Sequence, residues 1–258
     1  MAPSGVPQAD KAVTYMAEIL AKLNGEIRAL VTQLDTERGG AGLISDKQAL
    51  ANAARVRQQI LALVAERQGQ VIDVLEQGVA AAADAVAAAN DLGDFNAQAT
   101  RTLQEIADGR ADEVAAAFQK GQRQIAEAIA VGLTTGADLN DLIDQVAREV
   151  DTSFARAQSA VDTGIVGAGR AVTMRAGREA DTDPRDPIVF RYVGPNDSKT
   201  RPFCRPILGQ CFSDAAISRL DNGQGLAVDT FGGGYGCRHS WSPILTSEAK
   251  LQGYTIVG

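Results

Sequence analysis

Aromatic residues are scarce in this chain of 258 residues: one Trp, four Tyr and seven Phe make up 5% of it. A β-sandwich fills its core with aromatic and β-branched side chains, so this composition argues against one. Alanine is abundant instead, and a small side chain of high helix propensity suits helices that pack closely. The composition therefore predicts a mainly α-helical protein.

Long apolar runs are also missing. No stretch approaches the roughly 20 apolar residues that cross a bilayer, and the Ala-rich segment 79–90 is interrupted by Asp84. The first five residues, Met1 to Gly5, carry neither a basic segment nor an apolar core, so we expect no secretory signal peptide. We therefore expect a protein made in a cytosol, with reduced thiols and no membrane partner.

The charge of the chain, −7 in total, is unevenly distributed. Before Arg170 there are 14 Lys and Arg against 23 Asp and Glu, whereas from Arg170 onward there are 11 against nine. A protein that binds nucleic acid along its whole length carries a strongly basic surface. The acidic N-terminal part therefore argues against that class.

Four long helices are predicted before residue 183. The first has an a/d heptad seam with spacings of 3 and 4, made by Val13, Met16, Leu20, Leu23, Ile27, Leu30 and Leu34. It ends at the glycine run 39–42, and we expect it to pack against later helices of this chain rather than a second copy. The second helix begins at a capping box at Ser45 and ends near Asn90. The third ends near Gly132, and the fourth begins at an N-cap at Asp138.

The C-terminal part has a different pattern. Asp183-Pro184 and Asp186-Pro187 end the helical region, because proline does not fit a helix interior. The run 188–193 reads as a β-strand, with shorter strands expected at 225–228 and 254–257 and a helical turn within 213–220. The fold class is therefore mainly α: long N-terminal helices, as a helix bundle or coiled coil, followed by a small α+β domain with short strands.

We place the domain boundary between residues 137 and 138. The first domain is the helical region 1–137, and the second is 138–258, which consists of the helix 138–180 and an α+β module at 183–245. This module is small and poor in apolar residues, and such a unit often needs a metal, a disulfide or a docked partner for its stability.

The module also holds the scarce residues that bind soft metals. All three cysteines of the chain, Cys204, Cys211 and Cys237, lie here with its only histidine, His239. Three thiolates and an imidazole are a complete ligand set for tetrahedral zinc. The spacing Cys-x6-Cys, then Cys-x-His after a long gap, is looser than that of a zinc finger.

Three other interpretations of these residues stay open. Reduced cysteines are readily buried, so all three thiols could simply pack in a core. Cys204 and Cys211 could form a disulfide across a short loop, although the reducing cytosol disfavours one. Cys237 and His239 could form a nucleophile and base, but no orienting third residue is evident in the sequence.

The order of several residues in this part resembles a known family. These residues are Thr163 and Arg170 on a helix, Phe190 and Tyr192 on a strand, Asp197, Thr200, Arg201, Cys204 and Gly209, and the closing Cys237, Arg238, His239 and Pro243. Over residues 138–245 the chain resembles the C-terminal domain of the phage Mu F-like head morphogenesis proteins, which are minor head proteins of tailed bacteriophages. The N-terminal helices are similar to that family only in being helical.

The resemblance implies a structural role in a virion and no catalytic residue. Members of the family are associated with the portal vertex and the capsid interior, and some are ejected with the DNA. We therefore expect a minor head protein that is located in the virion and contacts the portal and capsid proteins. Contact with packaged DNA and formation of a homo-oligomer are further options. The alternatives are an enzymatic or toxin-like effector ejected with the DNA and an internal DNA-binding protein. No H-E-x-x-H, Walker loop or deaminase motif supports an enzyme.

Basic residues of the second domain have two interpretations. They could contact packaged DNA or an acidic portal surface, but we favour an ordinary solvated surface, because acidic residues are interspersed with them. These residues are Arg170, Arg175, Arg178, Arg185, Arg191, Lys199, Arg201 and Arg205. Next to the candidate ligands, Arg201 and Arg238 are expected to donate to loop carbonyls and so orient the site, together with Asp197 and Thr200.

Overall fold

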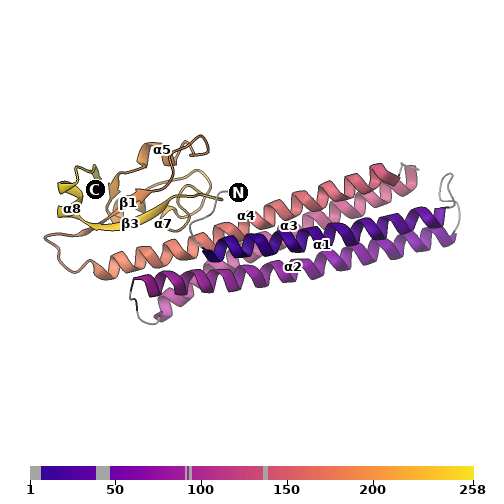
Figure 1. Ribbon diagram of the computed structural model, residues 1–258, viewed down its shortest axis with the longest axis horizontal. Coiled ribbons are helices and arrows are strands. Elements are labelled where there is room, and N and C mark those ends of the chain that lie inside the picture. The colour runs from indigo at the N-terminus through magenta and orange to yellow at the C-terminus, as the bar shows by residue number, and fades with distance from the viewer. Residues whose placement is uncertain (1–6, 39–46, 91, 93–94, 136–138) are drawn as a thin grey trace. The chain divides into compact units, whose positions relative to one another are not determined.

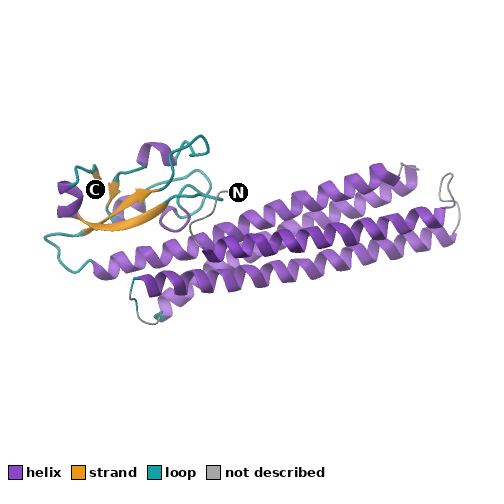
Figure 2. Ribbon diagram, viewed as in Figure 1, coloured by secondary structure: helices purple, strands orange, loops and turns teal. Residues whose placement is uncertain are grey.

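The computed structural model describes residues 7–38, 47–90, 92, 95–135 and 139–258. Its four long helices are α1 (Pro7–Arg38), α2 (Lys47–Ala89), α3 (Ala97–Thr135) and α4 (Leu139–Ala180). A small mixed sheet with short helices follows them (Figure 2), so the predicted fold class is confirmed. None of the described helices has an apolar stretch long enough to cross a lipid bilayer.

The chain divides into two compact units, and each long helix contributes to both. The first unit comprises Met1–Lys11, Leu75–Arg110 and Asp162–Gly258, and the second comprises Ala12–Val74 and Ala111–Val161. The predicted domain boundary at 137 and 138 lies outside the described residues. The same is true of the glycine run 39–42, the capping residue Ser45 and the N-cap at Asp138.

The second unit is a helix bundle in which segments of α1 to α4 lie side by side (Figure 1). Arg67 of α2 forms an ion pair with Glu26 of α1 at 2.9 Å, and Phe118 of α3 packs edge-on against Phe154 of α4 at 5.0 Å between ring centroids. Partners for α1 therefore come from its own chain, as we expected.

The buried stripe of α1 differs in part from the predicted heptad seam. Met16, Leu23 and Ile27 are buried as predicted, but Ala12 and Ile19 are buried too, while Leu20 and Leu30 are only half-buried. An α-helix has 3.6 residues per turn, so its buried face drifts from a strict 3.5-residue repeat. The side chains of Val13 and Leu34 are outside the described set.

The C-terminal part of the first unit is built on a four-stranded sheet, which we call the sheet module (residues 183–258). Its elements are β1 (Ile188–Val193), α5 (Cys204–Ile207), β2 (Cys211–Phe212), α6 (Asp214–Ile217), α7 (Val228–Phe231), β3 (Ser240–Leu245), α8 (Thr246–Leu251) and β4 (Ile256–Val257). The strand order is β3-β1-β2-β4, in which β1 is antiparallel to β3 and β2, and β4 is parallel to β2.

Alternation along the strands gives the sheet two different faces. Phe190 pairs with Phe212, and Tyr192 pairs with Trp241, so these four side chains share one face. This face carries the main core of the sheet module, with Met174 of α4 packed into the same cluster. The opposite face has a smaller core made by Val189, Cys211 and Ala249, the last of these from α8.

The strand predicted at 188–193 is confirmed as β1, and the expected helical turn is α6. The strand predicted at 225–228 is wrong: residues 221–227 form a loop, and α7 begins at Val228. Asn222 stabilises this loop by donating to the carbonyls of Leu226 and Gly232. Gly225 has a φ of +67°, which is incompatible with an extended strand.

Helix α4 extends through its glycines to Ala180 and carries the sheet module on one side. A Cβ atom added at Gly177 would lie 2.4 Å from the ring of Phe190, and one at Gly167 would lie 2.7 Å from the ring of Phe231. These glycines therefore permit close packing of aromatic rings against the helix. The hydroxyl of Thr163, on the same helix, accepts a hydrogen bond from the backbone of Gly236 at 3.1 Å.

Candidate metal site

The buried side chains of Cys204, Cys237 and His239 lie close together in the sheet module. Cys204 begins α5, Cys237 lies in the loop after α7, and His239 directly precedes β3. Their candidate ligand atoms all lie within 4.8 Å of one another. The two sulfurs are 3.8 Å apart, and Cys237 Sγ is 3.7 Å from His239 Nδ1. Two thiols and an imidazole in this arrangement could hold a metal ion.

The orientation of the histidine ring is set by a backbone carbonyl. Its Nε2 atom lies 2.9 Å from the carbonyl oxygen of Pro195. A carbonyl oxygen only accepts, so Nε2 carries the proton and donates it. Nδ1 then faces Cys237 and, in the neutral imidazole, has its lone pair available. Histidines that bind metals usually donate their second ring N–H to a carbonyl or carboxylate in this way.

The glycine loop (residues 232–236) closes on the sulfurs. The backbone N–H of Gly233 donates to Cys237 Sγ at 3.2 Å. A Cβ atom added at Gly233 would lie only 2.3 Å from Cys204 Sγ, so the position has no room for another residue. The glycines therefore bring backbone donors within reach of the sulfurs.

The two thiols differ in acidity. The contact with Cys204 and the positive charge of the Arg170 guanidinium lower the pKa of Cys237 below its ordinary value. The contact with Cys237 and burial raise the pKa of Cys204 above its ordinary value. The Arg170 guanidinium thus favours the charged form of the Cys237 thiol, which is the form that binds metal ions.

Two arginines hold the backbone around the ligands. The buried Arg170 of α4 donates from Nε to the carbonyl of His239 at 2.7 Å and from Nη2 to that of Cys237 at 2.5 Å. Arg201 donates to the carbonyls of Gly233 and Tyr235 in the glycine loop. Both guanidiniums therefore fix the loop that carries Cys237.

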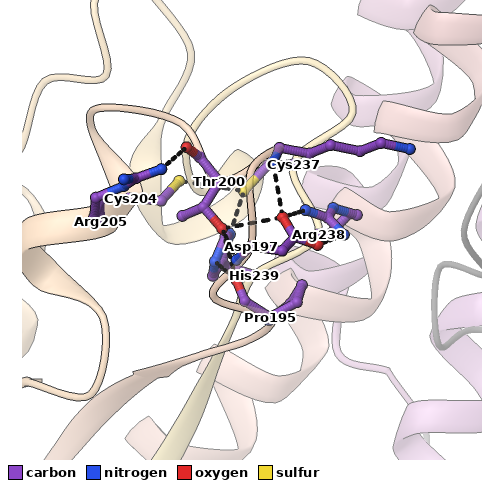
Figure 3. Close-up of polar contacts among 9 residues, drawn as sticks. Pro195, Asp197, Thr200, Cys204, Arg205, Cys237, Arg238 and His239 are labelled. Carbon is purple, nitrogen blue, oxygen red and sulfur yellow. Dashed lines mark hydrogen bonds and ion pairs between the residues drawn. The ribbon is translucent and has the colours of Figure 1, made fainter.

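A polar network joins the segment before α5 to Arg238, the residue between Cys237 and His239 (Figure 3). The other side chains of this network are those of Asp197 and Thr200. Arg238 donates to both carboxylate oxygens of Asp197, at 2.8 and 2.6 Å. The Thr200 hydroxyl donates to the carbonyl of Pro195 at 2.9 Å, the same carbonyl that accepts from His239. This network fixes the acceptor that orients the imidazole.

The structure brings together three of the four predicted ligands. Cys211 pairs with Arg191 in the sheet, and its side chain therefore lies on the opposite face from Tyr192. It is fully buried beside Val189 and Ala249. All three cysteines are free thiols, so Cys211 is a packed core residue and not a disulfide partner of Cys204.

Arg170 corrects our interpretation of the basic residues as a solvated surface. It is 3% exposed, and its donors are used by two carbonyls of the chain. Sequence reasoning missed this role and that of Tyr192, whose hydroxyl lies 3.4 Å from each sulfur of the cluster. The alternation of Tyr192 with Phe190 in the predicted strand could have shown that both face the core.

Comparisons of the chain with protein-family models, with curated proteins and with solved structures found no match.

The Asp197–Arg238 pair predicts an acid-sensitive contribution to stability. Hydrogen bonds from Arg238 lower the pKa of Asp197 below its ordinary value. A carboxyl with a lowered folded-state pKa stabilises the fold above its unfolded pKa of about 3.9, and this contribution is lost as the pH falls through the folded value. Asp197→Asn is therefore expected to be less stable than the wild type at neutral pH and to approach it below about pH 4.

The measurement is urea unfolding followed by the fluorescence of Trp241, the only tryptophan, which is buried in the sheet module. A chelator keeps metal from contributing. Arg238→Met is the matched variant, because it removes the other partner and is expected to give the same pH profile. A constant difference between wild type and Asp197→Asn from pH 7 to pH 3 would contradict the prediction.

Proposed function

We propose that Cys204, Cys237 and His239 bind one zinc ion that stabilises the sheet module. The donor set supports this proposal, since zinc is bound by thiolate sulfur and imidazole nitrogen in a tetrahedron. The surroundings support it as well: the imidazole is oriented by the Pro195 carbonyl, and a backbone N–H donates to the sulfur of Cys237. The ion would join α5, the glycine loop and the start of β3.

Elemental analysis of protein purified without added metal tests the zinc site. We expect about one zinc per chain in the wild type and none in Cys237→Ser, because a serine hydroxyl is a far weaker ligand than a thiolate. Folded wild-type protein that contains no metal would count against the site.

We further propose that the protein is a structural minor head protein of a tailed bacteriophage, located at the portal vertex or the capsid interior. The observation that carries this proposal is the use made of the residues that resemble the head morphogenesis family. Arg170 and Arg201 donate to backbone carbonyls, and Asp197 and Arg238 pair with each other. Their hydrogen bonds are made within the chain, as expected of residues that maintain a fold.

The burial of the cluster supports a structural role over a catalytic one. Cys237 is 7% exposed and His239 is 3% exposed. A substrate would reach the sulfur only after the glycine loop moved away, and that movement would break the contacts of Arg201 with its carbonyls. The Cys237–His239 contact is thus better suited to holding an ion than to attacking a substrate.

Analysis of purified phage particles tests the head-protein role. We expect the protein in particles made from the genome that encodes it, and we expect it to copurify with the portal protein when the two are coexpressed. Its absence from purified particles would contradict the role. Strong, salt-dependent affinity of the full chain for DNA would instead favour an internal DNA-binding protein.

A further inference from the structure

Tyr192 of β1 brings an oxygen atom to the two sulfurs of the cluster. Its hydroxyl lies 3.4 Å from Cys204 Sγ and 3.4 Å from Cys237 Sγ, and the side chain is fully buried. Cys204, Cys237 and His239 supply three donors, whereas a closed zinc site has four. Cys211, the fourth ligand predicted from the sequence, faces the other side of the sheet.

We infer that the oxygen of Tyr192 is the fourth ligand of the metal ion. This inference rests on the proposed zinc site. In tetrahedral zinc, bonds of about 2.3 Å to sulfur and 2.0 Å to nitrogen or oxygen place two sulfurs about 3.8 Å apart, and sulfur about 3.5 Å from nitrogen or oxygen. The observed distances are 3.8 Å between the sulfurs, 3.7 Å from Cys237 Sγ to Nδ1, and 3.4 Å from each sulfur to the hydroxyl.

The tyrosine ring is held in the orientation that this geometry requires. It packs against Trp241 at 4.6 Å between centroids and stacks on the His239 ring at 5.3 Å with 14° between the planes. The phenol oxygen of Tyr192 and Nδ1 of His239 thus both lie close to Cys237 Sγ. Because packing already fixes them, little side-chain freedom is lost when the ion binds.

The glycine loop covers the same group of atoms. A Cβ atom added at Gly232 would lie 3.0 Å from the Tyr192 hydroxyl and 3.1 Å from Cys237 Sγ. The backbone therefore packs directly against the hydroxyl and the sulfur. This packing leaves the phenol oxygen, rather than solvent, in position to complete the coordination.

Cobalt substitution tests the assignment, because Co²⁺ replaces zinc and its visible absorption depends on the number and type of its ligands. Tyr192→Phe removes one oxygen and keeps the ring. We expect Co²⁺ in the wild type to give the intense visible bands of a four-coordinate site. In Tyr192→Phe we expect shifted, weaker bands and zinc affinity reduced by about 10- to 100-fold or more, since changes beside a metal already cost that much.

Tyr254→Phe is the matched control. Tyr254 lies on the opposite face of the sheet, under the Arg191 guanidinium, and is expected to change neither the spectrum nor the affinity. The fluorescence of Trp241 in metal-free protein verifies that each variant is folded. In the wild type, addition of colourless zinc is also expected to give the ultraviolet difference spectrum of a metal-bound phenolate.

The outcomes separate the two proposals. If the wild type binds neither cobalt nor zinc, the metal site itself is wrong, and the role of Tyr192 is wrong with it. If the wild type binds metal but Tyr192→Phe has the same spectrum and affinity, the zinc site stands and only the assignment of Tyr192 is overturned. The absence of a phenolate difference spectrum in zinc-loaded wild type also overturns that assignment.

Discussion

Cys204→Ala is expected to abolish the zinc-dependent stability of the sheet module, whereas Cys211→Ala is expected to retain it. Both cysteines are fully buried, and both substitutions remove one sulfur. Only Cys204 lies within reach of Cys237 and His239. The two variants therefore distinguish a metal ligand from a packed thiol, because both make the same chemical change at a buried position.

The magnitude follows from linkage between binding and folding. Zinc at a free concentration a thousand times its dissociation constant stabilises the folded state by about 4 kcal/mol. We expect an increment of this size in the wild type and in Cys211→Ala, and almost none in Cys204→Ala. Each variant also loses some stability without metal, because removing a buried sulfur leaves a small cavity.

Urea unfolding with zinc and with a chelator, under reducing conditions, measures the increment as the difference between the two curves for each protein. Trp241 is the only tryptophan and lies in the core of the sheet module, so its fluorescence reports this part of the chain. An increment retained by Cys204→Ala, or lost by Cys211→Ala, would contradict the ligand set.

The long helices and the first strand were predictable because their patterns are local. The run 188–193 is β-branched and aromatic between prolines, and it forms β1 as predicted. In α1, three of the predicted seam residues are buried, although the burial of Ile19 in place of Leu20 reflects a drift that a heptad template leaves out. Local periodicity thus identifies an element better than it identifies every buried residue.

Cys211 shows where sequence reasoning about the site failed. The scarcity of cysteine and histidine indicated the region in which the cluster lies, but the face that each side chain occupies depends on strand pairing. Strand β2 has only two residues, Cys211 and Phe212, which is too few for any alternation to be visible. Its pairing with β1 nevertheless places Cys211 on the face opposite Tyr192. Strand β3 was missed because it contains a proline, Pro243, which argues against a strand in the sequence but is tolerated at the edge of a sheet.

Arg170 shows a second limit, since burial of a charged residue leaves no mark in the sequence around it. Its acceptors belong to residues 67 and 69 positions further along the chain. Among the other basic residues of the same helix, Arg178 is exposed and pairs with Asp214 at 2.7 Å. The local sequence does not show which of the two arginines is buried; only the fold determines this.

Arg170→Met is expected to destabilise the sheet module by about 3 to 6 kcal/mol, since two hydrogen bonds to a charged donor are lost and each contributes about 1.5–3 kcal/mol. Methionine retains much of the apolar volume of the side chain but leaves the carbonyls of Cys237 and His239 without their donor. These carbonyls belong to the two proposed ligand residues that are closest in sequence, so zinc affinity is expected to fall as well.

The control is Arg178→Met, two turns further along α4. The side chain of this arginine is 44% exposed, and it pairs with Asp214 and Asp229 at the surface, where each such pair contributes at most about 1 kcal/mol. Arg170→Lys separates charge from geometry: it keeps the positive charge, but its single ammonium lacks the forked donors that reach both carbonyls.

If Arg170→Met unfolds at the same urea concentration as Arg178→Met, the glycine loop and the ligands are held in place without the guanidinium. If Arg170→Lys restores full stability, charge alone accounts for the effect; a loss close to that of Arg170→Met would identify the two directed hydrogen bonds as the stabilising feature.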